Sequence, residues 1–161
     1  RPTSAAAALA LLLGLSPPLA RAESGQFPAG HLGFDIPAQW SAEGKKAKLS
    51  LLSPGEDAFI VLTVLGPGDD NLLRAEAGQL FNQYLADVAL ADSGQKTSLG
   101  GMAALRFKGT GSSDATSVAF TAAVVVPDKA TPVLVLAYTT QVNFAAVEPI
   151  FEAFFASLKP R

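Results

Sequence analysis

Two long apolar segments near the end of the chain constrain the fold more than any other feature of the sequence. They are TSVAFTAAVVVP (residues 116–127) and TPVLVLAYTT (residues 131–140), and the short PDKAT connection between them is typical of a hairpin. Successive positions in both segments are apolar, as they are in AFIVLTVLG (residues 58–66). Strands of this kind are covered on both faces. The sequence therefore predicts a sheet with a layer of structure on each side.

Two segments with helical periodicity supply the covering layers. Between residues 72 and 90 the apolar positions recur at intervals of three and four, which is typical of an amphipathic helix, and Asp70 or Asn71 is the predicted cap. A second helix is predicted from about residue 143 to residue 159. Pro149 lies inside it, so regular helix is expected to begin only a few residues earlier, or to kink there. Its apolar stripe is formed by Phe144, Val147, Phe151, Phe154, Phe155 and Leu158.

Further short strands are predicted over residues 31–37, 46–54, 96–100 and 102–109, and the last of them alternates between apolar and polar positions. Together with the longer strands they give an α+β fold: an antiparallel sheet of about six or seven strands with helices packed on its faces, an α/β/α sandwich. Two alternatives stay open at this point. Both helices could lie on one face, or a dimer could bury the other face.

The glycine-rich stretch GGMAALRFKGTG (residues 100–111) invites comparison with phosphate-binding loops. It lacks the Lys-Ser/Thr pair of a Walker loop, and the segment that follows GTG is a strand rather than a helix. Both glycine clusters are therefore interpreted as turns at the two ends of a strand. Leu105 and Phe107 are predicted to face the core, with Arg106 and Lys108 facing away.

The first residues have the layout of a secretory signal peptide: Arg1, an apolar run from Ala5 to Leu15, a Pro-Pro break, and small residues before the cleavage site. We expect residues 1–22 to be the signal peptide, cleavage between Ala22 and Glu23, and a single domain over residues 23–161. The run is too short to anchor the chain stably in a membrane. The chain has no cysteine, so neither a lipid anchor nor disulfides are expected, and the predicted location is the bacterial periplasm or the exterior.

Charge argues against a polyanionic partner. Arg1 and Arg21 fall within the predicted signal, so that 10 of the 12 basic side chains remain in the domain, against 14 acidic ones. The domain therefore lacks the excess of basic side chains that binding to nucleic acid requires, and an anionic membrane surface is not an expected partner.

The residue types that carry chemistry are sparse. His31 is the single histidine, it stands at the start of a strand, and no nucleophile motif accompanies it. Asp69 and Asp70 lack the spacing of a calcium loop, and acidic residues at a helix start stabilise the helix by themselves. Trp40 is interpreted as a residue that closes the core rather than one that stacks on a ligand. We predict no catalytic residues, no metal site and no cofactor.

The order of the segments is similar to that of a known superfamily. The opening GFDIPAQW resembles the start of PsbP-like domains, and GGMAALRFKGT and FAAVEPIFEAFFASL follow at matching places. The chain thus resembles the PsbP/Mog-like (DcrB-like) superfamily of small α/β/α sandwiches, over about Leu32 to Leu158. That resemblance implies an accessory or binding role, since its members are mostly non-enzymatic. It carries over no catalytic, metal-binding or GTPase-binding residue.

The predicted function is that of an exported, soluble, non-enzymatic accessory or binding protein of the bacterial cell envelope. Its expected partner is another envelope protein or an apolar peptide segment. The alternative is a periplasmic carrier of a small apolar ligand, if the rings of the last helix line a void. A hydrolase built on Asp69, Asp70 or His31 is the third possibility, and the sequence does not indicate an oligomeric state.

Overall fold

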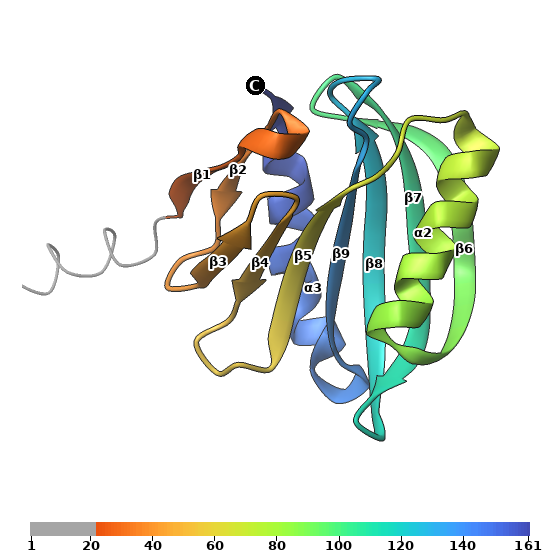
Figure 1. Ribbon diagram of the computed structural model, residues 1–161. Helices are drawn as coiled ribbons and strands as arrows, with labels where there is room; N and C mark the ends of the chain where they lie inside the picture. The colour runs from red at the N-terminus through yellow and green to blue at the C-terminus, as the bar shows by residue number, and fades with distance from the viewer. Residues whose placement is uncertain (1–21) are drawn as a thin grey trace, which may run out of the picture.

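The computed structural model describes residues 22–161, and Figure 1 shows the path of the chain. Its elements, in order, are β1 (Glu23–Phe27), the 3-10 helix η1 (Pro28–Gly30), β2 (Leu32–Ile36), β3 (Ser41–Lys45), β4 (Lys48–Leu52), β5 (Ala58–Val64), α2 (Asp70–Tyr84), β6 (Ala86–Leu99), β7 (Met102–Ser113), β8 (Thr116–Val126), β9 (Val133–Thr140), α3 (Gln141–Ser157) and β10 (Lys159–Pro160).

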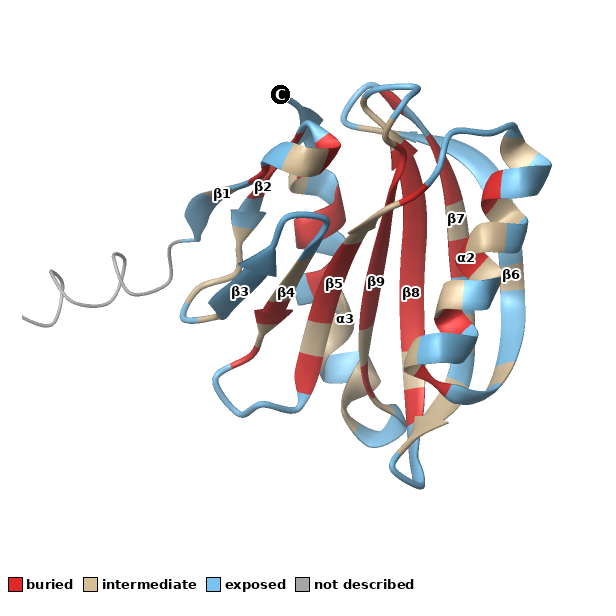
Figure 2. Ribbon diagram, viewed as in Figure 1, coloured by how far each residue is buried: buried red, intermediate tan, exposed pale blue. Residues whose placement is uncertain are grey.

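Seven of the strands form one antiparallel sheet in the order β3-β4-β5-β9-β8-β7-β6. Its centre is made of the strands that are apolar on both faces, so β5, β9 and β8 are the most buried parts of the chain (Figure 2). A second sheet, in the order β1-β2-β10, brings the two ends of the described chain together. The predicted α+β fold and the number of strands in the large sheet are confirmed. The small sheet was not predicted.

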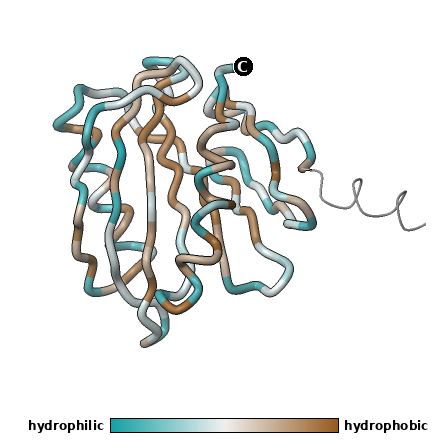
Figure 3. The backbone as a smooth tube through the Cα atoms, turned by 180° about the vertical axis from the view of Figure 1, so that it is seen from behind, coloured by the Kyte–Doolittle hydropathy of each residue, from teal (hydrophilic) through white to brown (hydrophobic). Residues whose placement is uncertain are grey.

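The two helices cover opposite faces of the large sheet. Val124 of β8 packs in the cluster that contains α2 residues, whereas Val125 packs in the cluster that contains α3 residues. Successive residues of a strand point to opposite faces, so the two clusters lie on either side of the sheet. Seen from behind in Figure 3, α3 lies against the sheet with the small sheet beside it. This arrangement excludes the alternative with both helices on one face.

The predicted helix over residues 72–90 is too long. α2 ends at Tyr84, and residues 86–99 form the edge strand β6, which pairs with β7 along most of its length. The misleading signal came from Val88, whose spacing from Tyr84 fits a helix. In the structure Val88 packs against the same apolar cluster as α2, but from β6. Val88 can be buried on the α2 face of the sheet from a helix or from a strand. The spacing of the apolar residues alone therefore did not distinguish the two.

The glycines of the stretch 100–111 play two different roles. Gly100 and Gly101 have φ of 56° and 79° and form the turn between β6 and β7, as predicted. The interpretation of Gly109 and Gly111 as turn residues is wrong, because both lie inside β7. A Cβ on Gly109 would stand 2.5 Å from the carbonyl oxygen of Ala89, since β6 bulges towards β7 there.

Helix α3 begins earlier than predicted. Thr140 caps it, because its Oγ1 accepts a hydrogen bond from the backbone N–H of Asn143 at 3.3 Å, and the helix runs from Gln141 through Pro149 to Ser157. The proline removes one hydrogen-bond donor, yet eight residues of helix precede it. No helix within residues 22–161 is long and apolar enough to cross a membrane.

The predicted signal peptide lies outside the described residues, apart from Ala22. Ala22 and Glu23, between which cleavage is predicted, are both exposed at the start of β1. A peptidase would therefore meet this bond at the surface of the domain. The cleavage site and the division into residues 1–22 and 23–161 stay predictions.

Candidate functional site

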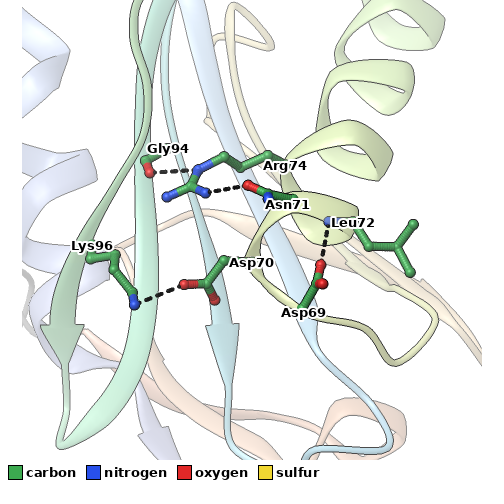
Figure 4. Close-up of polar contacts among 7 residues, drawn as sticks. All are labelled: Asp69, Asp70, Asn71, Leu72, Arg74, Gly94 and Lys96. Atoms are coloured by element: carbon green, nitrogen blue, oxygen red, sulfur yellow. Dashed lines mark hydrogen bonds and ion pairs between the residues drawn. The ribbon is translucent and has the colours of Figure 1, made fainter.

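The acidic pair at the start of α2 has a structural role in the fold (Figure 4). Asp69 caps the helix, because its Oδ1 accepts a hydrogen bond from the N–H of Leu72 at 2.9 Å. The predicted cap, Asp70 or Asn71, was thus one or two residues too late. Asp70 instead forms an ion pair with Lys96 of β6, with 3.1 Å between its Oδ2 and the lysine Nζ. Each carboxylate is engaged in holding α2.

Arg74 fastens the same end of α2 to the edge strand. Its Nε donates to the carbonyl oxygen of Gly94 at 2.9 Å, and one Nη donates to Asn71 at 3.1 Å. Gly94 is buried, has φ of 100° and lies at a bulge of β6. Within residues 22–161 no group of three or more His, Asp or Glu side chains could hold a metal ion. The polar cluster therefore stabilises the junction of α2 and β6.

His31 does not stand in a catalytic arrangement. It ends η1 in the left-handed conformation, with φ of 53°, and half of its side chain is exposed. Its Nε2 lies 3.7 Å from a carboxylate oxygen of Asp128. Neither Asp69 nor Asp70 is the partner of His31, so the structure does not bring together the residues on which the third possibility, a hydrolase, would be built.

The acidic residues of α3, Glu148 and Glu152, pair with basic side chains of β7. Glu152 accepts a hydrogen bond from Arg106 at 3.1 Å, and Glu148 lies 3.7 Å from the Nζ of Lys108. The guanidinium of Arg106 also lies over the ring of Phe155, 4.5 Å from its centre. Arg106 therefore packs under α3, where a cation over an aromatic ring is stabilised.

The aromatic stripe of α3 fills the core of the protein. Phe151, Phe154 and Phe155 are almost completely buried, and the ring centres of Phe154 and Phe34 are 5.2 Å apart. Ring contacts of this kind are typical of a densely packed interior. These side chains therefore fill the core, whereas a carrier of small apolar molecules would have needed them to line a void.

An apolar groove instead lies on the surface, between α3, the end of β2 and the loop that follows β2. We call it the α3–β2 groove. Its volume is about 400 Å³, which is within the range of sites that bind small molecules and peptide side chains. The residues that line it are Ala22, Asp35, Pro37, Ala38, Trp40, Pro149, Ile150, Ala153 and Phe154. Of these, Ala22 would be removed by the predicted cleavage.

Trp40 serves both the core and the groove. It is partly buried, and its ring meets that of Phe151 edge-on, with 6.5 Å between the ring centres and 80° between the planes. The prediction that Trp40 packs against the core is confirmed. The ring also forms part of the groove wall, a role that the sequence did not indicate. Tryptophan is among the residues that contribute most to binding at interfaces.

Asp35 gives the groove its single charged side chain. The backbone N–H of Asp35 donates to the Oγ of Ser157 at 2.9 Å, and that hydroxyl donates to the carbonyl oxygen of Phe154 at 2.7 Å. These two bonds hold the end of β2 against α3. The position of the carboxylate is therefore set by backbone contacts rather than by an ion pair.

The groove residues of α3 were not predicted from the sequence. Ile150 is 39% exposed although it is a large apolar residue, and Ala153 beside it is exposed as well. Both lie outside the aromatic stripe, on the side of α3 that a packing argument assigns to water. The exposed position of Ile150 could have indicated an interaction surface. The groove itself forms only because β2 lies beside α3, and β2 belongs to the small sheet that was not predicted.

The structure is thus a small α/β/α sandwich with an apolar groove on its surface. No family model matches the sequence, and no curated protein is significantly similar to it. Solved structures do match. The solution structure of cyanobacterial PsbP (CyanoP) from Synechocystis sp. PCC 6803 superimposes with a TM-score of 0.67 at 10% identity, over 91% of this chain and 96% of that one.

Two further structures show the same architecture. LpqN of Mycobacterium tuberculosis, described as involved in cell envelope biogenesis, has a TM-score of 0.62 at 16% identity, over 80% of this chain and 82% of its own. The Ran-binding protein Mog1p of Saccharomyces cerevisiae has a TM-score of 0.62 at 9% identity, over 87% and 95%. The chain thus has the PsbP/Mog-like fold that the resemblance predicted. Identities this low concern the fold alone.

Proposed function

We propose that this protein is a non-enzymatic accessory protein that binds an apolar segment of another protein in the α3–β2 groove. The observation that carries the proposal is the groove itself: an apolar surface with Trp40 and Ile150 in its wall, on a domain in which Asp69 and Asp70 hold helix α2. Exposed apolar surface of this kind marks interaction sites.

The similar structures support a binding role of this sort. Mog1p is described as a Ran-binding protein, and LpqN as a protein of cell envelope biogenesis. We further propose that residues 1–22 direct export and that residues 23–161 act in the periplasm or outside the cell, as a single soluble domain. The signal-like pattern of the first 22 residues supports that location.

The alternative, a carrier of a small apolar ligand, has less support. A carrier encloses most of its ligand, whereas the aromatic rings of α3 occupy the interior and the α3–β2 groove lies on the surface. A groove open on one side suits a peptide, because the chain of the partner continues beyond it.

A charge placed in the groove tests the proposal. Ile150→Asp is compared with Val142→Asp, a matched control on the same helix, since Val142 is 92% exposed and lies outside the groove lining. The probe is a synthetic leucine-rich peptide, and the readout is the fluorescence of Trp40, the single tryptophan of the chain. We expect Ile150→Asp to weaken binding about tenfold or more, equivalent to about 1.4 kcal/mol.

Val142→Asp should leave the affinity unchanged. Both variants should unfold at the temperature of the parent protein, because neither residue is buried. The proposal would be overturned if the parent protein bound no apolar peptide, or if the two aspartate variants lost affinity equally.

A further inference from the structure

We infer that the segment bound in the α3–β2 groove carries a lysine or arginine next to its apolar residues, and that this side chain pairs with Asp35. The inference rests on the proposed function, because it names the chemistry of the partner at the same site. It restricts the proposed ligands from apolar segments in general to apolar segments that carry a positive charge beside Asp35.

The first argument is the charge of the groove. Among the described residues that line it, Asp35 is the only charged one, and the other members are apolar. Asp35 is exposed, and none of the ion pairs formed among residues 22–161 includes its carboxylate. Asp35 therefore lines the groove without an ion pair to a cation of the described residues, while its backbone N–H is bonded to Ser157.

The second argument concerns the cations of the protein that lie nearby. The side chain of Arg161 passes over Gly33, two residues before Asp35 and therefore on the same face of β2. Lys159 pairs with Gly33 in the neighbouring strand. Both belong to the chain end beyond α3, and neither lines the groove. They reduce the negative potential along β2, and cleavage after Ala22 would add the α-amino group of Glu23 near the groove, so a basic side chain of the ligand competes with these cations for Asp35.

The third argument is the environment of the carboxylate. Apolar walls lower the local dielectric, so a charge beside Asp35 interacts more strongly than it would in open water. An acidic side chain at that place would be repelled, and a neutral one would gain little. A basic side chain could also lie against the ring of Trp40, where cations are attracted to the aromatic face. The apolar side chains of the ligand would therefore bind the apolar walls of the groove, and its basic side chain would bind beside them, at Asp35.

The experiment uses three synthetic leucine-rich peptides that differ at a single position, which is Arg, Gln or Glu. Their affinities are measured by Trp40 fluorescence for the parent protein and for Asp35→Asn. We expect the parent protein to bind the Arg peptide about threefold to tenfold more tightly than the Glu peptide. Asp35→Asn should remove this preference, and the preference should shrink as salt is added.

Asp87→Asn is the matched control, because Asp87 is an exposed aspartate of β6 outside the groove and its φ of 52° is one that asparagine also adopts. It should keep the preference for the Arg peptide.

The outcomes separate the two proposals. If the parent protein bound all three peptides equally, and Ile150→Asp still abolished binding, the groove would stand and the inference about charge would be overturned. The inference about charge would fail in the same way if Asp35→Asn kept the preference for Arg. If no peptide bound the parent protein, the groove function and the inference would both fail.

Discussion

The two faces of the large sheet are covered by helices of similar length, yet they differ in what the helices leave outside. On the α2 face the helix packs on β6, β7 and β8, and apart from Leu72 its outward side is polar or small. On the α3 face the helix contacts the large sheet and also β2, and its outward side shows Val142 and Ile150. One helix closes a core, and the other closes a core and borders a groove.

The difference indicates where function can be sought in a sandwich of this kind. Both faces need apolar burial, so aromatic residues alone do not distinguish them: Phe81 and Phe107 pack edge-on below α2, much as Phe34 and Phe154 pack below α3. The small sheet distinguishes the α3 face from the α2 face. It lies beside α3 without covering the helix completely and so forms the second wall of the groove (Figure 2).

The largest effect is expected from a substitution that removes apolar burial on the α2 face. Leu105→Ala should lower the free energy of unfolding by about 2–5 kcal/mol, because Leu105 is buried in the cluster below α2 and its removal leaves a cavity. On the same strand, Lys108→Ala should lower it by about 1 kcal/mol at most, since its ion pair with Glu148 is exposed. Urea denaturation of the two variants measures both.

The pair also tests whether the faces are independent. Neither Leu105 nor Lys108 lines the groove, so peptide binding by the folded fraction of Leu105→Ala should equal that of the parent protein. A loss of affinity in excess of the unfolded fraction would show that the α2 face shapes the groove, and the separation of the two faces would be wrong.

An intermediate effect is expected at the edge of the α2 face. Gly109→Ala should destabilise the protein by about 1–3 kcal/mol, because its Cβ would meet the carbonyl oxygen of Ala89 and the ring of Phe120. Gly78→Ala, on α2, is the control. Nothing lies within 4 Å of a Cβ there, so alanine should stabilise the helix by about 0.5–1 kcal/mol. Opposite shifts of the thermal midpoint are the expected result.

Equal shifts of both glycine variants would contradict this expectation. In particular, a harmless Gly109→Ala would mean that β6 can move away from β7, and that its bulges are not held by the close approach at Gly109.

Most of the central sheet could be predicted from the sequence, because strands apolar on both faces leave few alternatives. The strands around residues 58–66, 116–127 and 131–140 are found nearly where they were expected. Local signals failed where two structures satisfy the same pattern, as at Val88, which is buried from a strand at a spacing that fits a helix. The cap of α2 was misplaced because three consecutive polar residues are all capable of capping.

The groove could be predicted only in part. Trp40 drew notice as the single tryptophan, but its neighbours in the groove are ordinary residues such as Ala38 and Ala153. They come together because β2 pairs with the last residues of the chain, Lys159 and Pro160, far away in sequence. A strand of two residues, such as β10, gives no periodic pattern in the sequence. The groove that depends on its pairing with β2 could therefore not be predicted.

The smallest effect concerns the titration of the α2 face at alkaline pH. Both tyrosines of the chain, Tyr84 and Tyr138, pack against the cluster on that face. Burial raises the pKa of Tyr138 above its ordinary value, and the nearby Tyr84 and Asp114 add to the rise. The folded state therefore holds this proton more tightly than the unfolded state does. Its contribution to stability is complete below about pH 10 and is lost as pH rises towards the raised pKa.

Tyr138→Phe should remove that part of the alkaline loss, because phenylalanine has no proton to release and can keep the stacking on Phe59, whose ring centre lies 5.1 Å away. Denaturation at a series of pH values from neutral to alkaline should show a shallower decline for the variant. All other side chains are the same in both proteins, so the difference between the two curves isolates Tyr138. Parallel curves would mean that the hydroxyl is as well solvated in the folded chain as in the unfolded one, and that the α2 face is more open at β9 than the packing on Phe59 indicates.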